Sequence, residues 1–375
     1  MNVRIIGDVA VSPNLTAKDS ASVCVYPSTT LLNDGSIVCV YRRGTAKHSR
    51  DGVLVSQRSS DGGRSWSTPV SIYDAMSSRT PESVQTGAVC ETPRGGLLAF
   101  FTAVEAIKPD VYIFSEEGRQ LWQRPCVAVS PDGGRTWAPA RQLELTAVPR
   151  NVYLGSRPLI LPDGALLLPI EITDAHGQQM TLAAIAEDGG LNFGPAFPIA
   201  ADASGSLGFG DGRFTTLEDG TLLMLTWTYR NPSEETIWAH LCRSIDGGRT
   251  WSAPQPTNLV CQIMTPQAMG SRLIAAANVR TPPEGIWLFG SGDGGKTWDT
   301  SAAVQLWDPR ELRASGAVRS MLVPAPDRQG VWGALPSFTF GTPELVRLGA
   351  NDALVTYYAI IDGITHVRAC RFSIG

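Results

Sequence analysis

The chain has 375 residues, of which 43% are hydrophobic and 18% charged, and its net charge is −4. The hydrophobic fraction is too high for a disordered chain, and the weak acidity excludes the basic surface that nucleic acids or anionic membranes require. Thirty-eight glycines and 26 prolines, spread along the whole chain, indicate frequent tight turns between many short strands.

A strand–turn–strand pattern recurs six times along the chain. In each copy, two apolar runs flank a short turn rich in Gly, Asp or Asn, which is a hairpin signal. The copies occupy residues 30–42, 91–101, 159–172, 215–227, 268–280 and 346–358. A repeat of this kind predicts six sheets with the same topology.

A second motif, S-x-D-G-G-x-T-W, follows the first in five of the six units. It reads SSDGGRSW at 59–66, SPDGGRTW at 130–137, AEDGGLNF at 186–193, SIDGGRTW at 244–251 and SGDGGKTW at 291–298. The glycines tolerate the positive φ of a tight turn, the Asp can accept backbone N–H bonds, and the Trp can wedge between sheets. We interpret this Asp box as structural, because the alternating acidic ligands of a calcium loop are absent.

Together the two motifs predict an all-β fold, a six-bladed β-propeller with four-stranded antiparallel blades and Asp boxes at the turns between third and fourth strands. We expect residues 1–375 to form one propeller domain, with 364–372 as the third strand of the last blade and 2–11 as its outer strand. Closing the ring removes exposed sheet edges. Functional loops should gather at the channel mouth, where the inner strands begin.

The seven cysteines form no C-x-x-C pair, and most stand in apolar runs. They are therefore expected to be buried thiols, with no metal site and no cofactor. No apolar run reaches 18 residues, and the first residues lack the apolar core of a signal peptide. We expect a cytoplasmic protein, or a secreted or periplasmic one if a leader has been removed, with no nucleic-acid or membrane partner. The oligomeric state stays open.

The boxes and the blade pattern resemble the sialidase superfamily of BNR, or Asp-box, repeat proteins, over nearly the whole chain. Sialidases hold a sugar carboxylate with three arginines and use an Asp as acid/base and a Tyr, assisted by a Glu, as nucleophile. By position, the resemblance implies Asp51 as the acid/base and Asp211 in place of the Glu. The family's first Arg is absent at Val25-Tyr26-Pro27, and its Tyr is absent near Thr342-Pro343, so the chain diverges from true sialidases.

The candidate site combines this resemblance with the charged residues at strand ends on the mouth. The catalytic candidates are Asp51, Asp211, Glu82 and Glu171, with Tyr357 as a replacement for the missing nucleophile. The substrate-binding candidates are Arg42, Arg43, His48, Arg157, Arg213, Arg230 and Arg280. Converging guanidinium groups favour an anionic ligand, and paired carboxyl groups favour acid/base chemistry.

These residues predict a sialidase-like glycoside hydrolase that acts at the channel mouth on an acidic or otherwise polar sugar, without the standard sialidase mechanism. Two alternatives remain open. One is a non-catalytic propeller that binds a glycan or a protein, and the other is a polysaccharide lyase directed at uronates.

Overall fold

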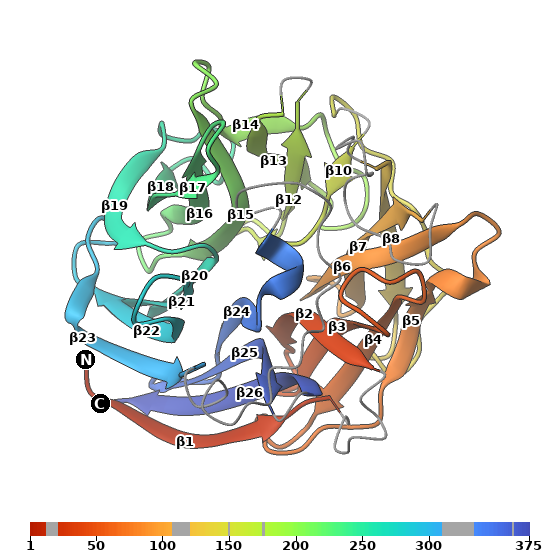
Figure 1. The fold of residues 1–375 in the computed structure, drawn as a ribbon, viewed down its shortest axis with the longest axis horizontal. Helices are drawn as coiled ribbons and strands as arrows, with labels where there is room; N and C mark the ends of the chain where they lie inside the picture. The colour runs from red at the N-terminus through yellow and green to blue at the C-terminus, as the bar shows by residue number, and fades with distance from the viewer. Residues whose placement is uncertain (13–21, 107–120, 149–150, 175–176, 310–333, 362–363) are drawn as a thin grey trace.

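The structure is a computed structural model that describes residues 1–12, 22–106, 121–148, 151–174, 177–309, 334–361 and 364–375. Six antiparallel sheets surround a common axis, and the chain passes from one to the next around the ring (Figure 1). Two 3-10 turns, η1 (Ala75–Ser77) and η2 (Leu335–Ser337), accompany the strands. The predicted all-β, six-bladed propeller is confirmed.

The first three blades follow the chain order. Blade 1 contains β2 (Val23–Leu31), β3 (Ile37–Gly44), β4 (Val53–Ser59) and β5 (Val70–Asp74). Blade 2 contains β6 (Glu82–Glu91), β7 (Leu97–Glu105), β8 (Gln123–Ser130) and β9 (Arg141–Gln142). Blade 3 contains β10 (Val152–Tyr153), β11 (Leu159–Ile160), β12 (Leu166–Thr173), β13 (Gln179–Ala186) and β14 (Phe197–Ala200). Its inner strand is therefore split at 154–158, which the sequence pattern did not predict.

The last three blades repeat the order. Blade 4 contains β15 (Leu207–Thr216), β16 (Leu222–Arg230), β17 (Glu235–Thr236), β18 (Trp238–Ser244) and β19 (Gln255–Val260). Blade 5 contains β20 (Met264–Met269), β21 (Arg272–Val279), β22 (Gly285–Ser291) and β23 (Asp299–Trp307). Blade 6 contains β24 (Phe340–Arg347), β25 (Asp352–Ile361), β26 (Ile364–Ile374) and, from the other end of the chain, β1 (Val3–Ala10), which pairs with β26.

The Asp boxes lie at the turns between third and fourth strands, as predicted. In blade 4, Asp246 Oδ1 accepts the backbone N–H groups of Arg249 and Thr250 at 3.1 and 2.9 Å, and Thr250 Oγ1 donates to Oδ2. These bonds, led by the Thr250 hydroxyl, lower the pKa of Asp246 to about 2. Gly247 and Gly248 have φ of 71° and 84°, which only glycine adopts without strain. The box is thus a turn clip that remains ionised.

The hydrophobic core lies between the blades. Six apolar clusters of buried residues each join two neighbouring sheets around the ring. The box residue Trp298, 2% exposed, belongs to the cluster between blades 4 and 5. All seven cysteines are free and buried, in accord with the sequence-based expectation. Because each blade buries both of its faces, the inner strands have fixed positions around the channel.

Candidate functional site

The inner strands bulge where they enter the channel mouth. Register shifts interrupt the pairing of the first two strands in blades 1, 2, 4 and 6. In three of these bulges a non-glycine residue has positive φ: Tyr26 (59°), Asp211 (53°) and Thr342 (50°). Left-handed backbone at such residues costs about 1–3 kcal/mol and collects at functional sites, where bulges redirect side chains. The strain therefore identifies this end of the ring as the candidate active site.

Two of the predicted carboxylates meet on the side of blades 3 and 4. Glu171, on β12, is 3% exposed, and the backbone N–H of Asp211 donates a hydrogen bond to its carboxyl group. Burial, and next the charge of Asp211, raise the pKa of Glu171 to about 8. Burial also raises the pKa of Asp211, although Arg213 opposes it. Burial of Glu171 and the neighbouring charge of Asp211 thus favour a proton on this pair at neutral pH.

Neutral polar groups from blades 3 and 4 hold this pair in place. Gln179 Nε2 donates to Glu171 Oε2 at 3.0 Å, and the hydroxyl of Tyr229 donates to Gln179 Oε1 at 3.3 Å. Ser156 Oγ lies 3.5 Å from Glu171 Oε1. The ring of Tyr229 crosses directly over Gly208, where a Cβ would come within 2.3 Å of it. The glycine is therefore required to let this tyrosine reach the channel.

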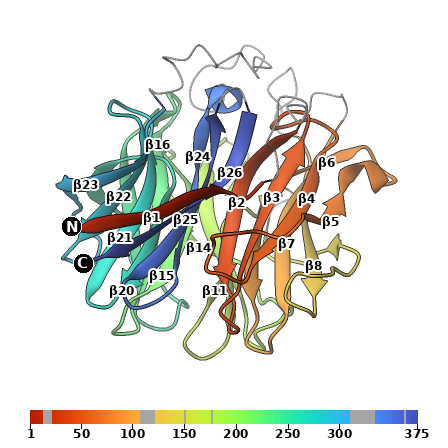
Figure 2. The same ribbon diagram turned by 90° about the horizontal axis from the view of Figure 1, so that it is seen from below.

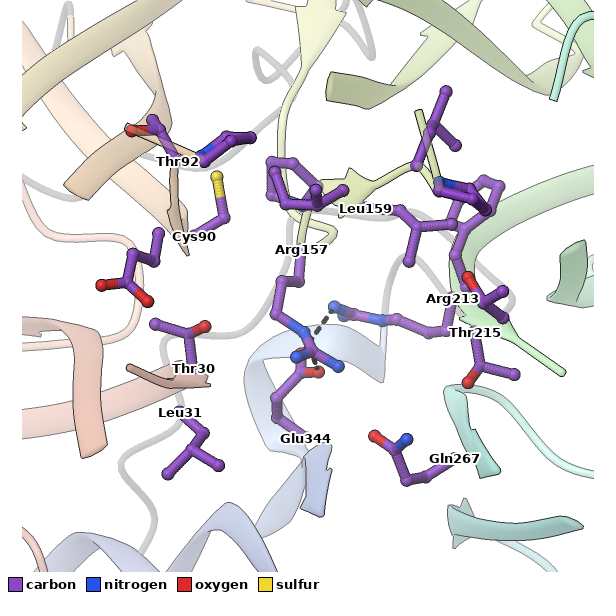
Figure 3. Close-up of a pocket in the computed structure, with 18 of the residues that line it drawn as sticks. Thr30, Leu31, Cys90, Thr92, Arg157, Leu159, Arg213, Thr215, Gln267 and Glu344 are labelled. Carbon is purple, nitrogen blue, oxygen red and sulfur yellow. Dashed lines mark hydrogen bonds and ion pairs between the residues drawn. The ribbon is translucent and has the colours of Figure 1, made fainter. Parts of the chain in front are cut away.

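Behind the pair, three charged residues close the channel. Glu344, on β24, contacts Arg157 Nε at 3.1 Å and Arg213 Nη1 at 3.3 Å (Figure 3). Arg157 comes from the break between β10 and β11, and Arg213 follows the bulge of β15. On the far side of this cluster, a cavity of about 600 Å³ is lined by the ends of the inner strands. That cavity faces the opposite end of the ring from the mouth.

A basic and aromatic cluster occupies the mouth where blades 1, 5 and 6 meet. Arg280 stacks on the rings of Phe338 and Phe340, 4.0 and 4.3 Å from their centroids. Lys47 donates to the carbonyls of Leu335 and Phe338. These contacts hold η2, the blue coil before β24, over one end of the channel (Figure 1; Figure 2).

The aromatic members of this cluster lie near both charged sides of the mouth. Tyr358 lies 5.0 Å beneath Lys47 and edge-on to Tyr26, whose hydroxyl is 3.3 Å from His48 Nε2. Arg280 and Asp211 both act electrostatically on Tyr358. The cations of blades 1 and 5 thus face the acids of blades 3 and 4 across one mouth.

The sequence profile of the BNR repeat-like domain matches residues 35–310. The chain belongs to this family. No curated protein matches the sequence significantly. The predicted relationship to sialidase-like, Asp-box propellers is thus confirmed.

Several solved structures have the same fold. A protein of unknown function from Dyadobacter fermentans has a TM-score of 0.75 at 21% identity, covering 100% of this chain and 99% of that one. The Hadza microbial sialidase Hz136 has a TM-score of 0.69 at 17% identity, with coverage of 97% and 68%. An α-L-arabinanase from Penicillium chrysogenum, complexed with arabinobiose, has a TM-score of 0.63 at 13% identity, with coverage of 98% for both chains. At these identities the similarities establish the fold alone.

Several predicted residues of this BNR repeat-like propeller lie away from the acid pair. Glu82 accepts two hydrogen bonds from Arg124, at 2.7 and 2.8 Å, and one from Tyr73, within the body of blades 1 and 2. Tyr357 is fully buried and donates to Asp8 on the outer strand β1 at 3.0 Å. Successive strand residues point to opposite faces, so its neighbour Tyr358 reaches the mouth instead. The structure therefore does not support a catalytic role for Glu82 or Tyr357.

The predicted arginines differ in their placement. Arg42 is 0% exposed and donates to the carbonyls of Val84, Ala46 and Ser49, so it supports the loop between β3 and β4. Arg43 points to the opposite face of β3. Arg230 is 56% exposed and lies 3.7 Å from Glu235 on the surface. Arg42, Arg43 and Arg230 therefore do not reach the channel. The structure does bring four other predicted residues there, namely Arg157, Arg213, Arg280 and His48.

Asp51 lies half-buried in the loop that Arg42 supports. Burial raises its pKa, but hydrogen bonds from Ser49 and Thr45 outweigh that effect and lower it. These hydrogen bonds favour the ionised form of Asp51, which suits a base better than the predicted acid. The sequence pattern does not reveal that Glu171 is buried behind Asp211.

Glu344, Lys47 and Tyr358 were not among the catalytic or substrate-binding candidates. Tyr358 ends the sixth repeat, one residue beyond Tyr357, and Glu344 lies two residues before that repeat begins, so the repeat could have indicated them. Within the described ranges, no group of three His, Cys, Asp or Glu side chains could hold a metal ion. Nor does that part of the chain contain a helix long and apolar enough to cross a membrane.

The two strand-end arginines Arg42 and Arg230 give a matched test of this placement. We expect Arg42→Met to lower the free energy of unfolding by about 3 kcal/mol, because it leaves buried carbonyl oxygens without donors. Arg230→Gln should change it by less than about 0.5 kcal/mol, because that side chain is in water. Urea denaturation of both variants measures the difference. Equal effects would contradict the placement of Arg42.

Proposed function

We propose that this protein is a glycoside hydrolase that cleaves an anionic or otherwise polar sugar at the channel mouth. The observation that carries the proposal is the buried Glu171 carboxyl group beside Asp211, a placement that favours a bound proton at neutral pH. A carboxyl group protonated at neutral pH can protonate the glycosidic oxygen as the bond to the leaving group breaks. Asp211, whose side chain is 21% exposed, is the member of the pair that contacts the sugar.

A second carboxylate is needed as the base that activates water, or as the nucleophile. Asp51 suits this role because hydrogen bonds keep it ionised, and it comes from the loop of blade 1 at the same mouth. No tyrosine occupies the usual nucleophile position, which Thr342 and Pro343 fill. Acid and base thus come from different blades, as the propeller geometry allows.

The residues on the opposite side of the mouth suit an anionic or otherwise polar sugar. Arg280 is half-buried, and a guanidinium group pairs well with a carboxylate. The aromatic residues Tyr26 and Tyr358 beside it provide apolar surface for a sugar ring. Two structural neighbours, a sialidase and an arabinanase in complex with arabinobiose, also favour a carbohydrate ligand.

A panel of chromogenic glycosides tests the proposal. It contains a sialoside, a glucuronide, a galacturonide and an arabinofuranoside, with a neutral glucoside for comparison. We expect release of the chromophore from at least one anionic or arabinosyl substrate. Sugar binding by calorimetry without any cleavage would instead support a non-catalytic glycan-binding propeller. An ultraviolet-absorbing unsaturated product from a polyuronate would support a lyase.

A further inference from the structure

Glu344 is a buried carboxylate with no direct role in the proposed reaction. Its side chain is 1% exposed, and it contacts Arg157 at 3.1 Å and Arg213 at 3.3 Å (Figure 3). An ionised carboxylate in this position is stable only because two guanidinium groups offset the loss of hydration. Glu344 therefore controls where these two positive charges lie.

Arg213 is shared between two carboxylates from different blades. Its Nη1 contacts Glu344 and donates to the carbonyl of Gly155 at 3.2 Å, while its Nη2 lies 3.6 Å from Asp211 Oδ1. The contact with Asp211 is longer than a hydrogen bond, so the guanidinium leans toward Glu344. Within the described structure, its buried Nε has no hydrogen-bond partner. Glu344 and Asp211 thus compete for Arg213, which does not use all of its hydrogen-bond donors.

We propose that Glu344 is a positioning residue that keeps the Glu171–Asp211 pair protonated by holding Arg213 away from Asp211. This inference rests on the proposed function, in which the pair supplies the proton. If Glu344 lost its charge, Arg213 would move toward Asp211 and favour its ionised form. The pair would then release its proton at a lower pH.

The other groups that face the pair do not carry a competing charge at neutral pH. Tyr153 from β10 and Tyr358 from β25 are close enough to interact electrostatically with Asp211, and burial raises the pKa of both hydroxyls. Tyr229 from β16 contacts the pair through the neutral Gln179. Arg157 pairs with Glu344 and donates to the carbonyl of Leu345. Arg213 is therefore the charge that acts on the pair, and Glu344 is the group that positions it.

The test is a titration of the pair in the full-length protein, read without substrate. Side-chain carboxyl carbons are labelled with ¹³C, and the signals are assigned with Glu171→Gln and Asp211→Asn. We expect Glu344→Gln to lower the midpoint of the pair by about one pH unit or more. The matched control is Asp8→Asn, which breaks another ion pair of blade 6, with Arg368, and should leave the midpoint unchanged.

A second variant covers the case in which Glu344→Gln fails to fold. Arg157→Gln leaves Glu344 with Arg213 alone, so the pull on Arg213 increases and the midpoint of the pair should rise. A folded Glu344→Gln protein with the wild-type midpoint would overturn the inference, as would a fall in the Arg157→Gln midpoint. Because the titration needs no turnover, an absence of glycoside cleavage would refute the proposed function without obscuring this result.

Discussion

Replacing Asp211 by Asn is expected to lower kcat/KM by about 10²- to 10⁴-fold, which is the usual contribution of general acid–base catalysis. The substitution keeps the size of the side chain and the backbone N–H that donates to Glu171. It removes the carboxyl group that, under the proposed function, exchanges the proton with the sugar. The measurement is steady-state kinetics on the glycoside that the panel identifies, with thermal unfolding to confirm that the variant is folded.

The control for this prediction lies at the other end of the same hairpin. Asp219 is exposed in the turn between β15 and β16, where its carboxylate accepts the N–H of Thr221 at 2.9 Å. Asp219→Asn makes the same chemical change in the same blade, away from the mouth, and should leave kcat/KM within twofold of wild type, about 0.4 kcal/mol. Wild-type turnover in Asp211→Asn would remove Asp211 from the mechanism.

Replacing Glu171 by Gln is expected to remove a pH dependence of stability. The folded-state pKa of Glu171 is about 8, against an ordinary value of 4.5. A carboxyl group with a raised pKa contributes stability that is fully present below pH 4.5 and is lost as the pH rises through 8. The loss over this window is on the order of 4 kcal/mol. A glutamine has no proton to lose, so the variant should be more stable than wild type at pH 9.

Urea denaturation at pH 5, 7 and 9 checks this second prediction. The Asp boxes do not interfere, because hydrogen bonds lower the pKa of Asp132, Asp246 and Asp293 to about 2. Their contribution is present above the ordinary value of 3.8 and is lost only as the pH falls toward 2. A wild-type stability that does not change between pH 5 and 9 would contradict the raised pKa of Glu171.

Turn chemistry explains why the fold could be predicted from the sequence. The residues of each Asp box form its turn by themselves, as Asp246 and its two glycines illustrate. No distant residue is needed to form it. The repeat of hairpin and box then determined the number of blades. The split inner strand of blade 3 was not predicted, although Gly155 and Pro158 are residue types that interrupt strands.

The site could be predicted only in part, because strand-end position does not reveal which way a side chain points. Arg42 and Arg280 both end second strands, yet one lies under a loop and the other lies at the mouth. Tyr357 and Tyr358 differ by one residue, and the pairing of Tyr358 with Gly341 decides which of them faces the channel. The direction in which each of these side chains points depends on strand register and on loop conformation.

The amino-acid sequence by itself determined the blades, their order and the end of the ring at which charged residues gather, because hairpins and Asp boxes form through local contacts. Only the tertiary structure decided that the buried Glu171 lies beside Asp211 and that Arg213 contacts Glu344 more closely than Asp211. These residues come from blades 3, 4 and 6. Their protonation depends on burial and on distances across the channel, which exist only once the ring has closed.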